Sequence, residues 1–117
     1  MSRAGRFREE VTFQRLPVDA ATDFDAYGNP VGAWADLGTV LADVREMPGR
    51  EVFAAGRPEG TRLATVRVRA EPVTQGVTPA DRMVARGVTW NIKSSPVQID
   101  VKAMVLEFTA ETGGAVQ

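Results

Sequence analysis

The sequence contains no cysteine and no histidine. Without cysteine the chain forms no disulfide and has no thiolate nucleophile. Without histidine it lacks the most common general base and the most common metal ligand. These absences argue against catalysis, and we expect no enzymatic activity, no catalytic residue, no cofactor and no bound metal.

An excess of charge of one sign and a long apolar run are missing too. With 14 basic and 15 acidic residues, the net charge of −1 gives no electrostatic basis for coating nucleic acid. The apolar run Ala103–Leu106 is only four residues long, far short of a membrane span. The first residues, which include Arg3, Arg6 and Arg8, are not expected to form a signal peptide. We therefore expect a soluble protein that is made in a cytoplasm and has no membrane partner.

Two further segments contain residues of the kind that bind calcium or phosphate, but without the spacing or the context that such sites need. Asp19, Asp23 and Asp25 lack the spacing and the closing glutamate of a calcium loop, so solvated carboxylates are the preferred interpretation. The segment Gly56–Gly60 precedes a predicted strand, whereas a phosphate-binding loop precedes a helix. Neither segment predicts a ligand site.

Apolar and polar residues alternate along several short stretches, which is the pattern of strands with one dry and one wet face. Gly32 and Gly38 permit bends in the second stretch. Strands are predicted over about 9–15, 31–45, 62–71, 82–85, 88–93 and 97–109. A chain of 117 residues with 44% hydrophobic content then forms one all-β domain, residues 1–117, with ends at about 1–8 and 110–117 that we expect to be flexible. The predicted fold is a small, closed or partly open β-barrel of about six strands.

The residues on the apolar phase of these strands predict the core. The aromatic residues Phe13, Trp90 and Phe108 share this phase, so we expect them to pack inside rather than to stack on bases. The predicted core consists of Val11, Phe13, Val40, Val44, Val66, Val68, Val88, Trp90, Ile92, Met104, Leu106 and Phe108.

A long loop over 46–60 separates the second and third predicted strands. A tight hairpin needs only about two to five residues, and a loop this long in a small domain is typically functional or disordered. Residues 50–55 have helical propensity and permit a short helix of at most two turns. Val52 and Phe53 are bulky and apolar, so we expect them either to pack on a partner or to cap one end of the barrel.

The basic residues are twelve arginines and two lysines. Arginine makes bidentate contacts with carboxylates and is enriched at protein interfaces, although genomic base composition explains the same excess. Several arginines fall on the wet strand faces or at the base of the loop. The predicted subunit interface consists of Arg45, Arg67, Arg69, Glu46 and Glu51, with Asp43 as a further carboxylate of the neighbouring subunit.

Several short blocks, in order along residues 3–92, resemble the head–tail joining or head closure family of tailed phages and related gene-transfer particles. Each block is short, and their order makes the set specific. The blocks are Arg3–Arg8 leading to Val11–Arg15, Asp25–Gly28 followed by Trp34, Ala42–Arg45 leading to Pro48–Glu51, Val66–Arg69, Val77–Arg82 and Val88–Ile92. The residues after Thr109 match nothing in that pattern.

The resemblance implies a small barrel that assembles into a homo-oligomeric ring, of six- or twelve-fold symmetry, at the head–tail neck of a particle made in the bacterial cytoplasm. A portal or adaptor ring would lie on its head side, and a tail terminator or tail tube protein on its tail side. Packaged double-stranded DNA would pass through the lumen. The loop would then act as a gate, with Met47, Arg50, Val52, Phe53 and Arg57 as the gating residues.

A second interpretation is a free-standing small-barrel adaptor that binds nucleic acid or peptide. Barrels that bind single strands combine exposed arginines with exposed aromatic residues. Arg67 and Arg69 meet the first requirement, and no aromatic residue on a wet face meets the second. The location of the protein in purified particles distinguishes the two interpretations.

Overall fold

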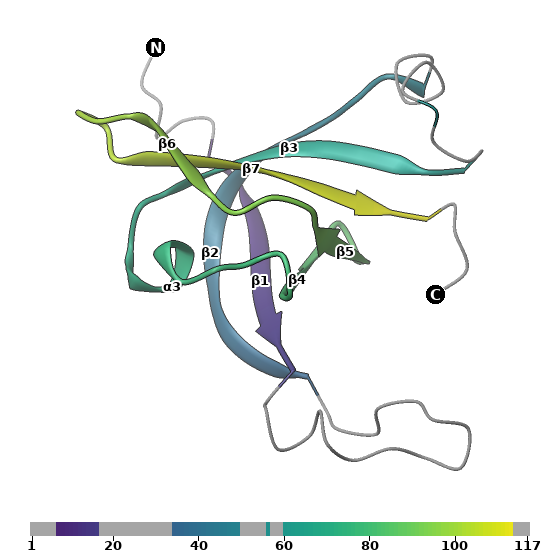
Figure 1. Cartoon of the computed structure of the whole chain (residues 1–117), viewed down its shortest axis with the longest axis horizontal. Helices are drawn as coiled ribbons and strands as arrows, with labels where there is room; N and C mark the ends of the chain where they lie inside the picture. Colours follow the sequence, from purple (N-terminus) through teal and green to yellow (C-terminus); the bar gives the residue numbers. More distant parts are fainter. Residues whose placement is uncertain (1–6, 17–33, 50–55, 57–59, 114–117) are drawn as a thin grey trace.

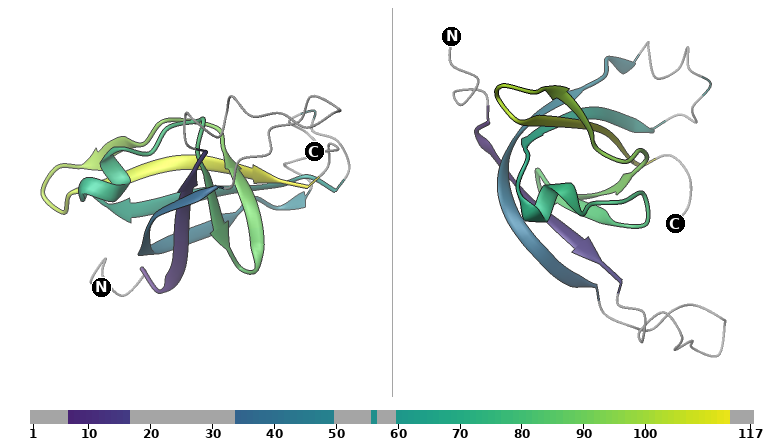
Figure 2. Two further views of the ribbon diagram at one scale, coloured as in Figure 1. Left: turned by 90° about the horizontal axis from the view of Figure 1, so that it is seen from below. Right: turned by 60° about the vertical axis from the view of Figure 1, so that its left-hand side comes forward.

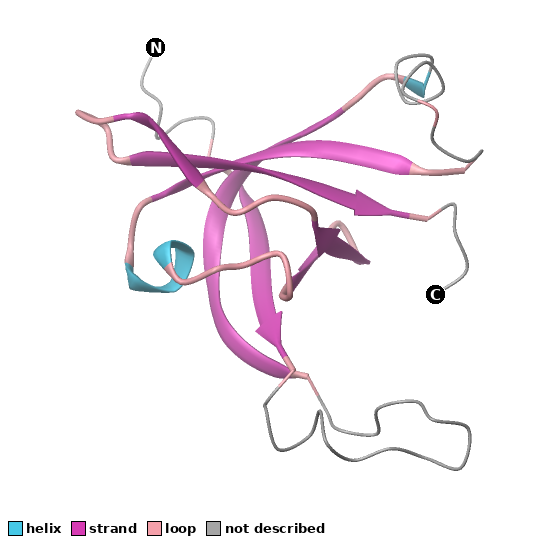
Figure 3. Ribbon diagram, viewed as in Figure 1, coloured by secondary structure: helices cyan, strands magenta, loops and turns pink. Residues whose placement is uncertain are grey.

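The computed structural model describes residues 7–16, 34–49, 56 and 60–113. This part of the chain is nearly all β-structure (Figures 1 and 3); helix α3 spans a single turn, and Gly49 is helical at the edge of the described residues. The elements are β1 (Glu9–Arg15), β2 (Ala35–Glu46), β3 (Arg62–Arg69), α3 (Pro72–Gln75), β4 (Arg82–Ala85), β5 (Val88–Ile92), β6 (Val97–Asp100) and β7 (Val105–Thr112).

Six of these strands close into an antiparallel barrel. Neighbouring strands follow the order β3-β2-β1-β4-β5-β7, and β7 pairs with β3 to complete the ring. Strand β6 lies outside this ring and pairs only with β7 among the described strands, so that the two form a hairpin at the side of the barrel (Figure 2). The predicted all-β barrel is confirmed, with one strand more than the six expected.

A bulge bends β2 where the sequence predicts flexibility. Phe13 pairs with Gly38 and Gln14 pairs with Asp36, so Leu37 is an extra residue on β2. Gly38 has a φ of +157°, a conformation that a residue with a β-carbon rarely adopts. Strand β2 begins at Ala35, and the first part of the predicted strand, 31–33, lies outside the described residues.

The turn between β4 and β5 is the tightest connection in the barrel. Ala85 pairs with Val88, and both residues between them have positive φ, 56° for Arg86 and 71° for Gly87. Two such residues make the type I′ turn whose twist matches that of paired strands. The strands predicted over 82–85 and 88–93 leave only these two residues between them, in agreement with the turn, and the turn directs the Arg86 side chain back over the barrel.

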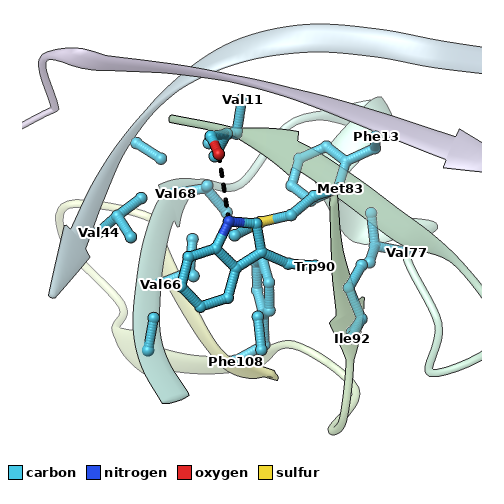
Figure 4. Close-up of a cluster of buried hydrophobic side chains, with 14 of the residues drawn as sticks. Val11, Phe13, Val44, Val66, Val68, Val77, Met83, Trp90, Ile92 and Phe108 are labelled. Atoms are coloured by element: carbon cyan, nitrogen blue, oxygen red, sulfur yellow. Dashed lines mark hydrogen bonds between the residues drawn. The ribbon is translucent and has the colours of Figure 1, made fainter. Parts of the chain in front are cut away.

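The barrel encloses one hydrophobic core around Trp90 (Figure 4). The Trp90 ring is fully buried, and its Nε1 donates a hydrogen bond to the carbonyl oxygen of Ala85 at 3.2 Å. The rings of Phe13 and Phe108 meet nearby with centroids 5.8 Å apart. Of the predicted core, the fully or almost fully buried members are Val11, Phe13, Val44, Val66, Val68, Trp90, Ile92, Leu106 and Phe108.

The other three predicted core residues differ from expectation. Val40 and Val88 are only partly buried, although both pack against the core. Met104 was predicted to be inside and is 46% exposed with a φ of 53°. The reason is that the strand predicted over 97–109 is in fact two strands, β6 and β7, joined by a turn over 101–104 that contains Met104.

Structure is also present where the sequence predicted connections or loose ends. The connection over 72–79 contains α3, in which the backbone amide of Glu71 donates to Thr74 Oγ1 at 2.9 Å. Phe7, in the end expected to be flexible, is buried, and β7 continues through Thr112. The short helix expected over 50–55 lies outside the described residues. No helix in the described residues is long and apolar enough to cross a membrane.

Candidate docking face at the base of the long loop

A charged surface covers the outside of β2, β3 and β7 beside the base of the long loop. Cross-strand register places Asp43 beside Arg67, and Arg67 in turn beside Glu107. One row further along, Arg45 lies beside Thr65. We call this surface the stem face, because it contains the strand ends from which the loop leaves. A depression of about 260 Å³ on it is lined by Asp43, Arg45, Glu46, Met47, Thr65 and Arg67.

The two ion pairs on the stem face differ in exposure, because the Arg67–Glu107 pair is solvated whereas the Asp43 side chain of the second pair is only 12% exposed. Arg67 Nε lies 2.9 Å from Glu107 Oε2, and both side chains are about one-third exposed. Arg45 Nε lies 3.3 Å from Asp43 Oδ2, which accepts no hydrogen bond from any described residue. An exposed pair such as Arg67–Glu107 contributes at most about 1 kcal/mol. Arg67 can therefore exchange Glu107 for a carboxylate of another protein at little cost in stability.

Arg69 lies apart from the stem face. Its guanidinium carbon is 5.3 Å from the centroid of the Phe7 ring, within the range of a cation–π contact. It lines a different depression, together with Leu41 and Glu71. The structure thus brings together Arg45, Glu46, Met47 and Arg67 among the predicted site residues and leaves Arg69 outside the group.

Glu46, the last residue of β2, is held by two arginines. Arg62 donates to both of its carboxylate oxygens at 2.9 Å, and Arg86 Nη1 lies 2.6 Å from Oε2. Arg86 also contacts Glu9 Oε2 at 2.6 Å and donates to the carbonyl oxygen of Val44 at 2.9 Å. The hydrogen bonds from Arg62, opposed by partial burial and reinforced by Arg86, lower the pKa of Glu46 to about 2.

This network fixes the strand ends that carry the loop. It joins β1 through Glu9, β2 through Glu46 and β3 through Arg62, with Arg86 of the β4–β5 turn at its centre. The guanidinium carbon of Arg62 also lies 5.1 Å from the centroid of the Trp90 ring. Next to the network, the Met47 amide donates to the Leu63 carbonyl oxygen at 2.8 Å. The base of the loop is therefore anchored to the core and to three strands.

Sequence reasoning missed Arg86, Arg62, Glu9 and Glu107 as parts of this site. Their partners are far away in the sequence, and each strand's own pattern gives no signal of which residue will lie beside it. Of the predicted site residues, Arg50, Glu51, Val52, Phe53 and Arg57 lie outside the described residues.

The arrangement offers charge and shape for docking. Within the described ranges, no three residues of the types His, Cys, Asp and Glu gather as metal ligands would. Asp81, whose side chain is buried, accepts hydrogen bonds from Arg15 Nε at 2.8 Å and from the Thr78 amide at 2.9 Å. Burial raises the Asp81 pKa, but the contacts with Arg15 and Thr78 outweigh it and lower this pKa, so the charged carboxylate anchors the 76–81 connection.

Comparisons with known proteins agree with the fold. The family model described as "Phage head completion protein" matches residues 2–113. The solution structure of protein SF1141 from Shigella flexneri 2a is similar, with a TM-score of 0.62 and 23% identity over 99% of this chain and 100% of that chain. A chain from the virion of a native gene transfer agent particle also has a TM-score of 0.62, with 19% identity over 93% of this chain and 98% of that one. No curated protein matches the sequence.

Proposed function

We propose that this chain, which belongs to the phage head completion protein family, forms a ring at the head–tail junction of a tailed phage or phage-like particle. The family is one of structural proteins, which agrees with the head-closure role expected from the sequence. The similar chain from a gene transfer agent virion supports a place in the virion. In the ring, the protein retains packaged DNA and offers the surface to which the tail attaches.

The observation that carries this proposal is the agreement in family and fold along almost the entire chain. The family model covers residues 2–113, and the virion neighbour covers 93% of the chain with almost all of its own length. The similarity therefore extends over almost the entire length of both chains. On that barrel the stem face supplies a charged docking surface that needs no chemistry.

The charge of the barrel suits a channel through which DNA must move. A net charge of −1 gives little counterion-driven affinity for a duplex. A lumen of near-neutral charge lets DNA slide, whereas a basic lining would retain it.

Within this role the long loop acts as the gate, by steric closure alone. Its base is held by the Glu46 network and by the hydrogen bond from the Met47 amide to the Leu63 carbonyl oxygen, so the strand ends from which the loop leaves are fixed to the barrel. Met47, Arg50, Val52, Phe53 and Arg57 are the proposed gating residues, and Arg45, Glu46, Glu51, Arg67 and Arg69 the proposed subunit contacts. A portal or adaptor ring is the proposed neighbour on the head side, and a tail terminator or tail tube protein on the tail side.

The decisive experiment removes the gene product from particle assembly and locates a tagged copy in complete particles. We expect DNA-filled heads without tails when the protein is absent, and gold label at the neck when the tagged copy is supplied. As a control, the same tag on a capsid protein should place the gold label on the head surface. Normal infective or transducing particles made without the protein would disprove the proposal.

A further inference from the structure

A second depression, separate from the stem face, lies where β2 and β3 diverge. Its volume is about 340 Å³, larger than that of the depression on the stem face. Strand β3 pairs with β2 only from Ala42 to Glu46, so before Ala42 the strand β2 continues beside β1 alone (Figure 1). We call this hollow the Arg69 depression; it is lined by Phe7, Thr39, Val40, Leu41, Arg69 and Glu71.

The guanidinium of Arg69 has no polar partner among the described residues. Its carbon lies 5.3 Å from the centroid of the Phe7 ring, and no hydrogen bond or ion pair of the side chain within the described ranges accompanies this contact. Other arginines each pair with a carboxylate, namely Arg15, Arg45, Arg62, Arg67 and Arg86. Because a guanidinium has five N–H donors, Arg69 presents donors to solvent that this part of the fold does not use.

Arg69 is exposed, yet its position is fixed from both ends. Phe7 beneath the guanidinium is buried, with 6% of its surface exposed, so the ring is a firm platform. The Arg69 backbone pairs with Val105 of β7, and its carbonyl oxygen accepts a hydrogen bond from Thr74 Oγ1 at 2.6 Å. A group that is already positioned loses little conformational entropy when it binds.

The charges of the lining favour an anion at Arg69. Glu71 is the acidic member of the lining, and it belongs to the capping box of α3, where its carboxylate interacts with the first turn of the helix. Its charge is therefore directed to the helix, whereas that of Arg69 is open to a ligand. The first six residues of the chain include Arg3 and Arg6 and no acidic residue, so they cannot supply the carboxylate.

The rest of the lining suits the aliphatic part of an acidic side chain. Leu41 is 52% exposed, Phe7 contributes its ring, and Val40 packs against the core from this side. A glutamate has two methylene groups before its carboxylate, and these can cover the apolar wall while the charge reaches Arg69. A nucleic-acid phosphate has no such stem, so the lining fits a protein side chain better than a phosphate.

We propose that the Arg69 depression binds a glutamate side chain of a partner protein, with the carboxylate on Arg69 and the methylene groups against Phe7 and Leu41. The argument is the difference in cost between arginines. Arg67 and Arg45 must each leave a carboxylate of their own chain before they bind a partner. Arg69 gives up no such pair within the described chain, and it is therefore the arginine that recognises an acidic partner first.

The inference deepens the proposed function and rests on it for the place where the partner is met. There, Arg69 counts among the contacts, and the Arg69 depression now gives that contact a ligand class. A single ion pair in a depression of this size is weak by itself, because stable pairs of proteins typically bury about 800 Å² on each partner. It sets the preference for an acidic segment, and the affinity comes from the contacts around it.

Peptide binding to the isolated protein tests the site without particles. The probes are acetyl-Leu-Glu-Leu-amide and its neutral isostere acetyl-Leu-Gln-Leu-amide, titrated to millimolar concentration into isotope-labelled protein and followed by NMR. We expect saturable shifts of the Arg69 Nε–H and of the Leu41 backbone amide with the glutamate peptide. The glutamine peptide should bind about two- to fivefold more weakly, which is the effect of one exposed ion pair.

Arg69→Met is the decisive variant, because methionine keeps an apolar contact with Phe7 and removes the charge. It should bind the two peptides equally and unfold at the same urea concentration as the wild type. Lys102→Met removes a cation from an exposed position outside the depression, so it is the matched control and should retain the preference for glutamate. Arg69→Glu should bind acetyl-Leu-Lys-Leu-amide more tightly than the glutamate peptide.

Three results would overturn the inference. They are equal binding of the two peptides by the wild type, a preference for glutamate that survives in Arg69→Met, and shifts at Arg67 in place of Arg69. If Arg69→Met loses stability, the comparison of the two peptides on the wild type still decides. Gold label at the neck with equal peptide binding would leave the proposed function and remove the inference, whereas a preference for glutamate without label at the neck would do the reverse.

Discussion

Val73 of helix α3 rests directly on Gly38 of strand β2: a β-carbon added to Gly38 would stand 2.9 Å from Val73 Cγ2. Below 3.0 Å one of the two groups must move, and the positive φ of Gly38 adds backbone strain. The bulge in β2 and the position of α3 are therefore parts of one packing arrangement.

Gly38→Ala should consequently destabilise the protein by about 1–3 kcal/mol, the usual cost of overpacking. Urea denaturation followed by tryptophan fluorescence gives the measurement. Gly49→Ala is the control, since a β-carbon there meets nothing within 4 Å. Equal stability of the two variants would show that α3 does not rest on β2 in solution.

Trp90→Ala should cost about 3–5 kcal/mol, as expected for the loss of a large buried aromatic residue. Trp90 is completely buried, and its removal also leaves the carbonyl oxygen of Ala85 without the indole donor. Chemical denaturation monitored by circular dichroism measures the loss. Leu41→Ala, at a residue that is 52% exposed, should change the stability by less than about 0.5 kcal/mol. A small effect at Trp90 would mean that the core is centred elsewhere.

Glu46→Gln should alter the dependence of stability on pH. The folded-state pKa of Glu46 is lowered to about 2 from an ordinary value of 4.5. A lowered carboxylate pKa stabilises the fold above the ordinary value, and this stabilisation disappears as the pH falls toward the folded value. The wild type should therefore exceed Glu46→Gln in urea midpoint above about pH 4.5, and the difference should shrink toward pH 2.

The control for this pH series is Glu10→Gln, at an exposed position on β1. Its midpoint should follow that of the wild type throughout. A difference between wild type and Glu46→Gln that stays constant with pH would show that Glu46 is not held as an anion by Arg62 and Arg86.

Reversal of charge at Arg67 should separate folding from assembly. In Arg67→Glu the new carboxylate faces Glu107 and Asp43. Because the lost Arg67–Glu107 pair is about one-third exposed, the loss of stability should be about 1 kcal/mol. The exchanged pair Arg67→Glu with Glu107→Arg should recover that loss. If a neighbouring subunit contacts the stem face, both proteins should still fail to complete particles. Normal particle numbers from either protein would remove Arg67 from any essential interface, and the same comparison applies to Arg69→Glu.

Replacement of residues 49–58 by a short Gly-Ser linker tests the gate. The base of the loop remains, because Glu46, Arg62 and the bond between Met47 and Leu63 are kept. We expect a urea midpoint like that of the wild type and heads that lose DNA before tails attach. An unfolded product would identify Val52 and Phe53 as a barrel cap. Particles that keep their DNA would show that the loop is not the gate.

Much of the barrel could be predicted because its strands alternate so regularly. The bounds of β1 and β4 and the turn at Arg86 agree with expectation. The last two strands were merged because apolar residues continue through the turn that joins them. A signal was present: Val97, Ile99 and Val101 are odd-numbered, whereas Leu106 and Phe108 are even-numbered, and a single strand keeps one phase.

The candidate site was predictable only in part, for a physical reason. The period-two pattern places Arg45 and Arg67 on the wet face, where the structure has them. The partner of Arg67 is set by register with β7, 40 residues away in the sequence. Likewise, Arg86 reaches Glu46 and Glu9 only because its turn directs the side chain back over the barrel. Such contacts depend on how strands pair, which no single strand encodes.

The position of β7 also sets the order in which the barrel is made during synthesis. It is the last strand of the described chain, and it pairs with β3, β5 and β6. Arg62 pairs with Thr112, so closure of the barrel joins positions 62 and 112, which are 50 residues apart in the sequence. Until residue 112 has left the ribosome, the nascent chain holds an open sheet whose inner face has no cover. The barrel can therefore close only after β7 has been made, and chaperones that shield apolar surface would act on the subunit in that interval.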